Sequence, residues 1–248
     1  MPKIGIIGGS GLDDPRLLEE PQEIEAETAF GSPSSPLTLG RIGNVEVVVL
    51  ARHGRRHQLS PTQVNYRANI QALKDQGVTH ILATSACGSL RTRIGRGDFI
   101  IVDQFIDFTK HRETTFFDSF ENAAGHTAMA EPFDAVLRHT LFETAGALGY
   151  RVHDGGTMIT IEGPRFSTKA ESRMFRILGG DVINMSVATE AALANEAAVP
   201  YAVVAMSTDY DCWKEDEAPV TWDAILAVFN ENASKVKDLL SAVIPKIN

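Results

Sequence analysis

Short apolar runs, several rich in β-branched residues, alternate along this chain with longer segments of helical periodicity. The runs predict strands at residues 4–7, 45–50, 80–84, 99–102, 157–161, 182–183 and 201–206. The helical patterns predict helices at 62–76, 133–148, 171–178, 189–197 and 222–244. Strands that alternate with helices predict an α/β fold, with a mixed, largely parallel twisted sheet in a three-layer domain flanked by helices.

The 248 residues show no internal repeat, low-complexity tract or linker, so one domain over residues 1–248 is predicted. Residues 31–36 predict a loop between hairpin-like strands, and residues 110–132 a long irregular segment of a kind that is often functional. No apolar run approaches the roughly 18 residues of a membrane helix, and the chain opens on a predicted strand rather than a signal peptide.

Charge and cysteine content limit the partners of this protein. A formal net charge of −9 argues against nucleic acid or an anionic membrane as the main partner, because such surfaces need a basic excess. Cys87 and Cys212, the two cysteines, are too few for a disulfide framework and lack the spacing of metal ligands. We therefore expect a cytoplasmic protein without a metal site.

Small hydroxyl and basic side chains follow four of the predicted strands. In chain order they are Ser10, Arg52 with His53, Ser85, and Ser186. Because ligands of open α/β sheets collect at the carboxyl ends of the strands, one sheet edge can gather these side chains around one oxyanion. Hydroxyls, an Arg fork and a His suit phosphate oxygens, and glycines around Ser10 allow backbone N–H groups to converge. The pattern predicts a phosphate pocket.

Each of these stretches also has a purely structural interpretation. The sequence around Ser10 lacks the third glycine of the dinucleotide fingerprint, which argues against an NAD site, and its glycines can serve a tight turn alone. Residues 51–57 can form a solvated turn whose arginines pair with nearby acids. Residues 85–89 are expected in a loop, and serine and glycine are common in ordinary loops.

Two acidic residues, Asp209 and Asp211, follow the last predicted strand at a spacing of two. In an extended segment this spacing puts both side chains on one face, where they can accept hydrogen bonds from the amino and ring N–H groups of a nucleobase. Phe166 and Met185 are available as apolar walls for base and sugar. The alternative is that Asp209 caps a helix and Asp211 is solvated.

Nine short motifs occur in the order that one known family has them. They read GGSGLDD at 8–14, ARHG at 51–54, VNYRAN at 64–69, SACGSL at 85–90, DQFID at 103–107, MAEPF at 129–133, TIEGPRFS at 160–167, VINMS at 182–186 and TDYDCW at 208–213. On these motifs the chain, from residue 4 to about residue 247, resembles the S-methyl-5′-thioadenosine phosphorylases, the methylthioadenosine branch of the trimeric purine nucleoside phosphorylases.

The resemblance implies a nucleoside phosphorylase-like fold and a reaction. The reaction would be phosphorolysis of the N-glycosidic bond of S-methyl-5′-thioadenosine, a pentosyl transfer that gives adenine and 5-methylthioribose 1-phosphate in purine and methionine salvage. Inorganic phosphate would be a co-substrate, with no cofactor and no metal. The family works as homotrimers, sometimes paired into hexamers.

The resemblance also implies a role for each matching residue. Phosphate would be bound by Ser10, Arg52, His53, Ser85, Ala86 and Ser186. The nucleoside would be bound by Phe166, Ser167, Met185, Asp209, Asp211 and Trp222, and by His126 reaching toward the 5′ substituent held by a neighbouring subunit.

Base preference and catalysis both depend on Asp209. An ionised carboxylate only accepts hydrogen bonds, which suits a 6-amino group and therefore adenine. Family members that prefer 6-oxopurines carry Asn in place of Asp209, and the hypoxanthine and guanine enzymes carry Glu in place of Ser167. Phosphate beneath C1′ would capture an oxocarbenium-like sugar. Asp209, its pKa raised by burial beside Asp211, would be the general acid at N7 of the leaving purine.

The chain departs from the family pattern in three respects. Ser10 and Ser186 stand where Thr is more common, a change that keeps the hydroxyl. Trp222 stands where a smaller aliphatic residue is common, and the chain ends at Asn248 where many relatives continue into a helix over a neighbour's 5′ group. Adenosine, methylthioinosine and inosine therefore remain open as substrates. A hydrolase and a non-catalytic nucleotide-binding module are the alternatives from other classes.

Overall fold

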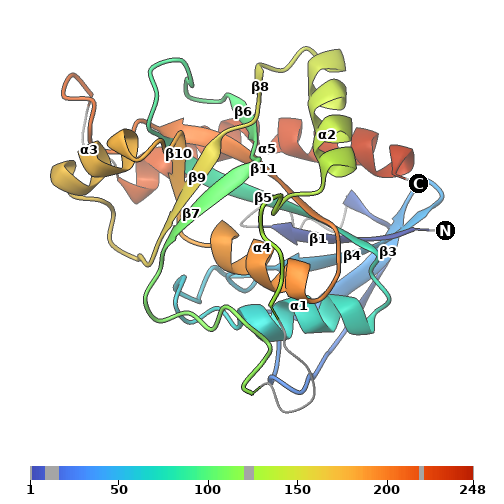
Figure 1. The fold of residues 1–248 in the computed structure, drawn as a ribbon. Coiled ribbons are helices and arrows are strands. Elements are labelled where there is room, and N and C mark those ends of the chain that lie inside the picture. The colour runs from blue at the N-terminus through green and yellow to red at the C-terminus, as the bar shows by residue number, and fades with distance from the viewer. Residues whose placement is uncertain (1, 9–16, 120–125, 218–220, 248) are drawn as a thin grey trace.

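The computed structural model describes residues 2–8, 17–119, 126–217 and 221–247 (Figure 1). Its strands are β1 (Lys3–Gly8), β2 (Glu19–Ile24), β3 (Leu37–Ile42), β4 (Val45–Ala51), β5 (His80–Ser89), β6 (Phe99–Ile101), β7 (Gln104–Phe108), β8 (Val152–Asp154), β9 (Thr157–Ile161), β10 (Val182–Asn184) and β11 (Tyr201–Asp209). Its helices are α1 (Tyr66–Asp75), α2 (Ala135–Ala147), α3 (Lys169–Ile177), α4 (Val187–Glu196) and α5 (Trp222–Val243), which continues into a 3₁₀ turn, η2 (Ile244–Lys246).

These strands form one mixed sheet that forks at β5. The main path runs β2-β3-β4-β1-β5-β10-β9-β7, and a branch runs from β5 through β11 and β6 to β8. The pairs β1-β4, β1-β5, β5-β11, β6-β8, β7-β9 and β9-β10 are parallel. The pairs β2-β3, β3-β4, β5-β10 and β6-β11 are antiparallel. The predicted mixed, largely parallel sheet is confirmed.

The fork opens because β5 changes partner along its length. It pairs with β1 as far as Ala83 and with β10 only at Gly88 and Ser89, while β11 follows its other edge. Within the described residues, the edge of β5 between Ala83 and Gly88 therefore has no strand partner. Ligands of α/β sheets bind where neighbouring strands part at their carboxyl ends.

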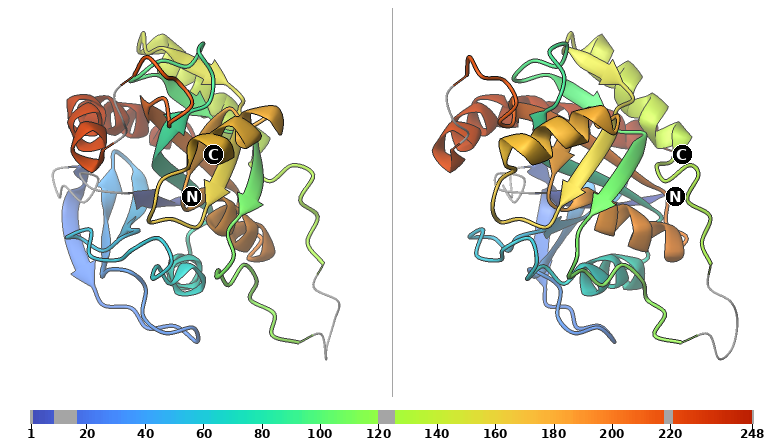
Figure 2. Two further views of the ribbon diagram at one scale, coloured as in Figure 1. Left: turned by 90° about the vertical axis from the view of Figure 1, so that its left-hand side faces the viewer. Right: turned by 60° about the vertical axis from the view of Figure 1, so that its left-hand side comes forward.

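Helices cover both faces of the sheet (Figures 1 and 2). On one face α1 and α4 contact each other, and an apolar core there includes Ile70 and Val187. On the other, α2 and α5 contact each other around a core that includes Leu141 and Leu239. α3 buries Phe175 in a smaller apolar cluster with residues of β9 and β10. The three predicted layers are present.

Helix starts follow capping signals in the sequence. The first predicted helix begins only at Tyr66, because Asn65 caps it by accepting a hydrogen bond from the Ala68 N–H at 3.1 Å. α3 begins with a reciprocal capping box between Thr168 and Glu171.

Residues 85–89 form the second half of β5 rather than the predicted loop. The ladder with β11 runs from Ile81 to Gly88, so backbone pairing continues past Thr84, the predicted strand end. β2 and β3 form the predicted hairpin around residues 31–36. β7 and β8 lie outside the predicted strands, and β8 has only three residues.

The irregular segment 110–132, called the arm below, extends from the body of the molecule (Figure 2). Its described residues, 110–119 and 126–132, form no helix or strand. Its first part is fastened to α4, because Thr115 Oγ1 and the Phe116 N–H donate to Glu196 at 3.1 and 2.8 Å. Over the part of the chain that the structure describes, no helix combines the length and apolar character that a membrane span needs.

Candidate active site

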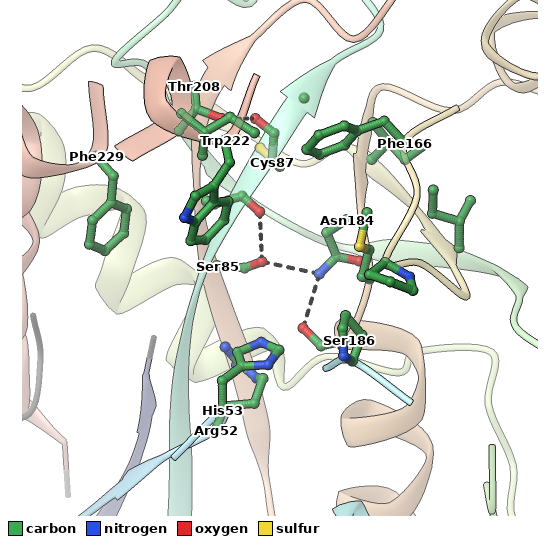
Figure 3. A pocket seen from close by; sticks show the side chains of 18 of the residues that line it. Arg52, His53, Ser85, Cys87, Phe166, Asn184, Ser186, Thr208, Trp222 and Phe229 are labelled. Carbon is green, nitrogen blue, oxygen red and sulfur yellow. Dashed lines mark hydrogen bonds between the residues drawn. The ribbon is translucent and has the colours of Figure 1, made fainter. Parts of the chain in front are cut away.

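A cavity of about 570 Å³ lies at the fork of the sheet (Figure 3). Its walls come from the loops after β4 and β9, from β5, β10 and β11 toward their carboxyl ends, and from the start of α5. In Figure 3 the side chains of Trp222 and Phe166 stand on opposite walls at one end, and polar side chains occupy the middle and the other end. The aromatic pair is Phe166 and Trp222, and the polar residues are Ser85, Asn184, Ser186, Arg52 and His53.

An amide bridges the hydroxyls of two predicted phosphate ligands. Asn184, the last residue of β10, donates from Nδ2 to Ser85 Oγ at 3.1 Å and to Ser186 Oγ at 3.5 Å. Its Oδ1 accepts from Thr160 Oγ1 at 2.9 Å, which fixes the orientation of the amide. β5, β10 and the start of α4 therefore hold the two hydroxyls close together.

Arg52 is 2% exposed and forms a buried, two-point ion pair with Glu190 of α4. Nε donates to Oε1 and Nη2 donates to Oε2 at 2.9 Å, while Nη1 donates to the carbonyl of Thr84 at 3.0 Å. Tyr201 donates its hydroxyl to the same carboxylate at 2.9 Å. Burial alone would lower the pKa of Arg52, but Glu190 raises it above its usual value, so the guanidinium stays charged.

His53 lies next to Arg52 in the same wall. Its Nδ1 is 3.0 Å from the carbonyl oxygen of Leu59. Burial and the charge of Arg52 lower the pKa of His53 to about 3, so the ring is neutral near pH 7. The ring stacks on His57 with centroids 4.6 Å apart, and His57 stacks on Trp222 at 5.0 Å. Three rings thus connect the Arg52 end of the cavity to its aromatic end.

Asp209 and Asp211 line the cavity beside Thr208, but not through one extended segment. β11 ends at Asp209, and Asp211 has a φ of 49°, in the left-handed region, so the predicted extended geometry is wrong. The turn instead brings the Asp211 N–H to 2.7 Å from Asp209 Oδ1, and Thr208 Oγ1 donates to Oδ2 at 2.8 Å. Burial raises the pKa of Asp209 despite these two hydrogen bonds, and it also raises the pKa of Asp211.

Met185 forms an apolar part of the wall against the loop after β9. Gly163 in that loop has a φ of 65°, and a side chain at this position would overlap Met185 Sδ. Phe166, on the same loop, is 37% exposed, and Trp222 at the start of α5 is 45% exposed. The aromatic end of the cavity is therefore its open end.

The cavity collects most of the predicted site residues. Those that line it are Arg52, His53, Ser85, Ala86, Phe166, Ser167, Met185, Ser186, Asp209, Asp211 and Trp222. Ser10 lies outside the described residues. His126 is exposed on the arm and is not part of the cavity lining.

Asn184 and Glu190 are polar residues of the site that the prediction does not single out. Asn184 directly precedes Met185 at the end of a predicted strand, so its position was an available signal. Glu190 meets Arg52 across 138 positions of sequence, and no local pattern reveals such a pairing.

The chain matches the model of the phosphorylase superfamily over residues 3–245. It is 56% identical over 249 residues to the S-methyl-5′-thioadenosine phosphorylase of Xenopus tropicalis, an alignment that covers 99% of this chain and 89% of that protein. It is 50% identical over 245 residues to the S-methyl-5′-thioadenosine phosphorylase of Saccharolobus solfataricus, with 98% and 89% covered.

Solved structures share the fold. Methylthioadenosine phosphorylase from Schistosoma mansoni in complex with adenine has a TM-score of 0.94 and 42% identity, covering 99% of this chain and 92% of that one. A mutant adenosine/methylthioadenosine phosphorylase from the same organism, in complex with methylthioadenosine, has a TM-score of 0.93 and 41% identity, with 99% and 91% covered. On this agreement of sequence and fold, the chain belongs to the phosphorylase superfamily and, within it, to the S-methyl-5′-thioadenosine phosphorylases.

Proposed function

We propose that this protein catalyses the phosphorolysis of S-methyl-5′-thioadenosine to adenine and 5-methylthioribose 1-phosphate. The observation that carries the proposal is a single cavity with oxyanion donors toward one end and two acceptor carboxylates beside Thr208. The named activity of the relatives, which match the chain over nearly its whole length, supports the same reaction.

Arg52, Ser85 and Ser186 form the proposed phosphate end, together with Ala86 and Ser10. A guanidinium has five N–H donors, and three of those of Arg52 are used within the described residues. The remaining two are available to an oxyanion. Ser85 Oγ donates to the Ala86 carbonyl at 2.9 Å, and rotation of this hydroxyl would let it donate to phosphate instead.

Asp209 and Asp211 form the proposed base end, with Phe166, Ser167 and Met185 around the purine and the sugar. A carboxyl has two oxygens, so Asp209 can accept from the 6-amino group with one and hold a proton on the other. Its raised pKa favours the protonated form that a general acid needs.

The reaction then requires no covalent intermediate with the protein. An unprotonated phosphate oxygen bonds to C1′ while the C1′–N9 bond breaks, and the electron pair of that bond leaves with the purine. The phosphate charge stabilises the oxocarbenium-like sugar, and a proton from Asp209 at N7 neutralises the departing adenine. Positioning and electrostatic stabilisation supply the rate.

The proposed assembly is a homotrimer, alone or paired into a hexamer, in which a neighbour completes the site. His126 lies on the arm, which extends away from the body that carries its own cavity (Figure 2). We propose that this His reaches the 5′ substituent of the nucleoside bound by the next subunit, where Trp222 forms the wall.

Adenosine is a second candidate substrate. The aromatic end of the cavity is open, with Trp222 45% exposed, so a 5′ hydroxyl could remain hydrated there. One solved relative is named an adenosine/methylthioadenosine phosphorylase.

A turnover assay tests these proposals. Release of free base is measured from methylthioadenosine, adenosine, methylthioinosine and inosine, each with and without inorganic phosphate. The proposal expects phosphate-dependent release of adenine, with the highest kcat/KM on methylthioadenosine. Faster release of hypoxanthine would contradict the adenine assignment, and equal rates without phosphate would identify a hydrolase.

A further inference from the structure

Among the described residues, the wall at the phosphate end of the cavity contributes one buried cation, Arg52, and no net charge. The charge of Arg52 is matched by Glu190, which is fully buried and paired with it at two points. His53 beside them is neutral near pH 7. An oxyanion at this end would therefore be bound by hydrogen bonds rather than by a net positive charge. Whether each wall group donates or accepts then decides which anion binds.

His53 has a defined tautomer. A backbone carbonyl only accepts hydrogen bonds, so the contact of 3.0 Å with Leu59 O places the ring proton on Nδ1. In the neutral ring Nε2 then carries a lone pair and acts as an acceptor. Burial of the ring and the charges of Arg52, His57 and Arg112 disfavour a second proton, and together they outweigh the Leu59 carbonyl, which favours it.

Nε2 of His53 has no hydrogen-bond partner among the described residues, and the ring lines the cavity. Figure 3 shows His53 and Arg52 at the same end of the cavity as Ser186. An oxyanion bound by Arg52, Ser85 and Ser186 would meet an acceptor at His53 in the same place as these donors.

We propose that His53 Nε2 accepts a hydrogen bond from a protonated oxygen of the bound anion, and so makes the site selective for hydrogen phosphate over fully deprotonated oxyanions. The identity of the anion rests on the proposed function. Inorganic phosphate near neutral pH carries at least one P–OH group, and arsenate keeps an As–OH group. Sulfate has no proton, so its oxygen would face the Nε2 lone pair without a hydrogen bond.

Two substitutions at His53 separate the acceptor from the rest of the ring. In His53→Asn the shorter amide still reaches the Leu59 carbonyl but has no atom at the place of Nε2. In His53→Gln the amide reaches that place and can turn either its oxygen or its N–H₂ group toward the anion. The matched control is Ser186→Ala, which removes a hydroxyl that can donate to any oxyanion.

Titration calorimetry of the full chain at pH 7.5, with phosphate, arsenate and sulfate, tests the proposal. The wild type is expected to bind phosphate and arsenate at least about tenfold more tightly than sulfate, the worth of one hydrogen bond to a charged ligand. His53→Asn should bind phosphate about tenfold more weakly than the wild type and sulfate with unchanged affinity. His53→Gln should bring the affinities for phosphate and sulfate close together. Ser186→Ala should weaken both anions by a similar factor.

Equal affinities of the wild type for sulfate and phosphate would overturn the proposal, as would His53 variants that weaken both anions alike. If one His53 variant does not fold, the other variant and a direct NMR measurement on the wild type still test the proposal. The ¹⁵N chemical shift of His53 Nε2 should be that of an unprotonated ring nitrogen at pH 7.5, and a protonated Nε2 would contradict the assignment. A wild type that binds sulfate as tightly as phosphate, yet shows phosphate-dependent turnover, would refute this inference alone. Absence of phosphorolysis by the wild type would refute the proposed function.

Discussion

Asp209 is held in one orientation by its neighbours and is close to a glycine. Thr208 Oγ1 and the Asp211 N–H each donate to one of its oxygens, at 2.8 and 2.7 Å, which leaves each oxygen a second lone pair for a ligand. Burial raises its pKa. Gly88 of β5 leaves room for the carboxylate, since a Cβ there would lie 2.9 Å from Asp209 Oδ1 and 3.0 Å from Ile183 Cγ2.

Asp209→Asn should reduce kcat on methylthioadenosine about 100-fold or more, because it removes the general acid. It should also raise activity on methylthioinosine relative to methylthioadenosine, since an amide can donate to a 6-oxo group. Because the protonated form is the active one, wild-type kcat should fall as pH rises through the raised pKa of Asp209. The kcat of the variant should not show this decrease. Unchanged kcat with only a higher KM would rule out the acid role.

Gly88→Ala should raise KM for the nucleoside at least about tenfold, because a displaced Asp209 loses one hydrogen bond to the base. Steady-state kinetics on methylthioadenosine measure the effect. Gly146→Ala is the matched control, since a Cβ there meets nothing within 4 Å and alanine favours the helix interior. Equal KM values for the two variants would show that the close approach of Gly88 to Asp209 does not affect nucleoside binding.

Single residues of the site were predictable where they follow a strand. Arg52 and Ser186 lie just after strands and Asp209 ends one, and the cavity includes all three. Ser85 also lines the cavity, although β5 continues past it to Ser89. Glu190 was not predictable, because an acid inside an amphipathic helix usually faces solvent and its partner comes from a distant strand.

Three separate segments meet at Glu162, directly after β9. Its carboxylate accepts from Thr62 Oγ1 and the Lys110 N–H, both at 2.6 Å, and from Arg112 Nε at 2.9 Å. Arg112 also donates to the Glu162 carbonyl at 2.7 Å and to Tyr66 Oη at 2.6 Å. This residue therefore fastens the base of the arm to the loops that form the cavity wall.

Glu162→Gln should loosen the arm and lower the free energy of unfolding by about 1.5–3 kcal/mol, the range for hydrogen bonds to a charged group. Burial alone would raise the pKa of Glu162, but its hydrogen bonds lower it to about 2. Its stabilising contribution is thus complete above pH 4.5 and is lost as pH falls through about 2. Urea unfolding at several pH values should show that the variant lacks this acid-dependent loss.

Limited proteolysis provides the second readout for the arm. Cleavage within residues 110–132 should be faster in Glu162→Gln than in the wild type. Glu215→Gln is the control, because Glu215 pairs with Arg173 at an exposed site. Identical cleavage rates in all three proteins would contradict the fastening role.

Strands and helices were predictable from periodicity, but the fork was not. Periodicity is a local property, and it predicted the positions of all five helices and of β1, β4 and β11. The continuation of β5 through Ser89 depends on pairing with β11 and β10, which are more than 90 residues away in the chain. Only the tertiary structure decides where that strand ends.

At the scale of the whole molecule, two apolar cores on opposite faces hold the forked sheet. The arm packs Phe116 against one of these cores and then extends from the body of the molecule (Figure 2). That 1–248 is one domain stays a prediction. The arm, with His126, is the part of the molecule whose proposed role needs a second copy.

His126→Ala should raise KM for methylthioadenosine with little change in KM for phosphate, because it would contact only the 5′ end. His139→Ala on the exposed side of α2 is the control.

Light scattering should give a molar mass of three or six times the 26.9 kDa of one chain, as expected for a trimer or a hexamer. Subunits with Asp209→Asn, coexpressed with His126→Ala subunits, should regain methylthioadenosine affinity in mixed trimers, and mere averaging of the two activities would contradict a shared site.

The central claim is that one cavity brings phosphate and an adenine nucleoside together for reaction. ³¹P NMR of methylthioadenosine and inorganic phosphate with the enzyme tests it most directly, with adenine followed by absorbance in the same sample. We predict that one inorganic phosphate disappears, and one sugar 1-phosphate signal appears, for each adenine released. Release of adenine with the phosphate signal unchanged would contradict the account.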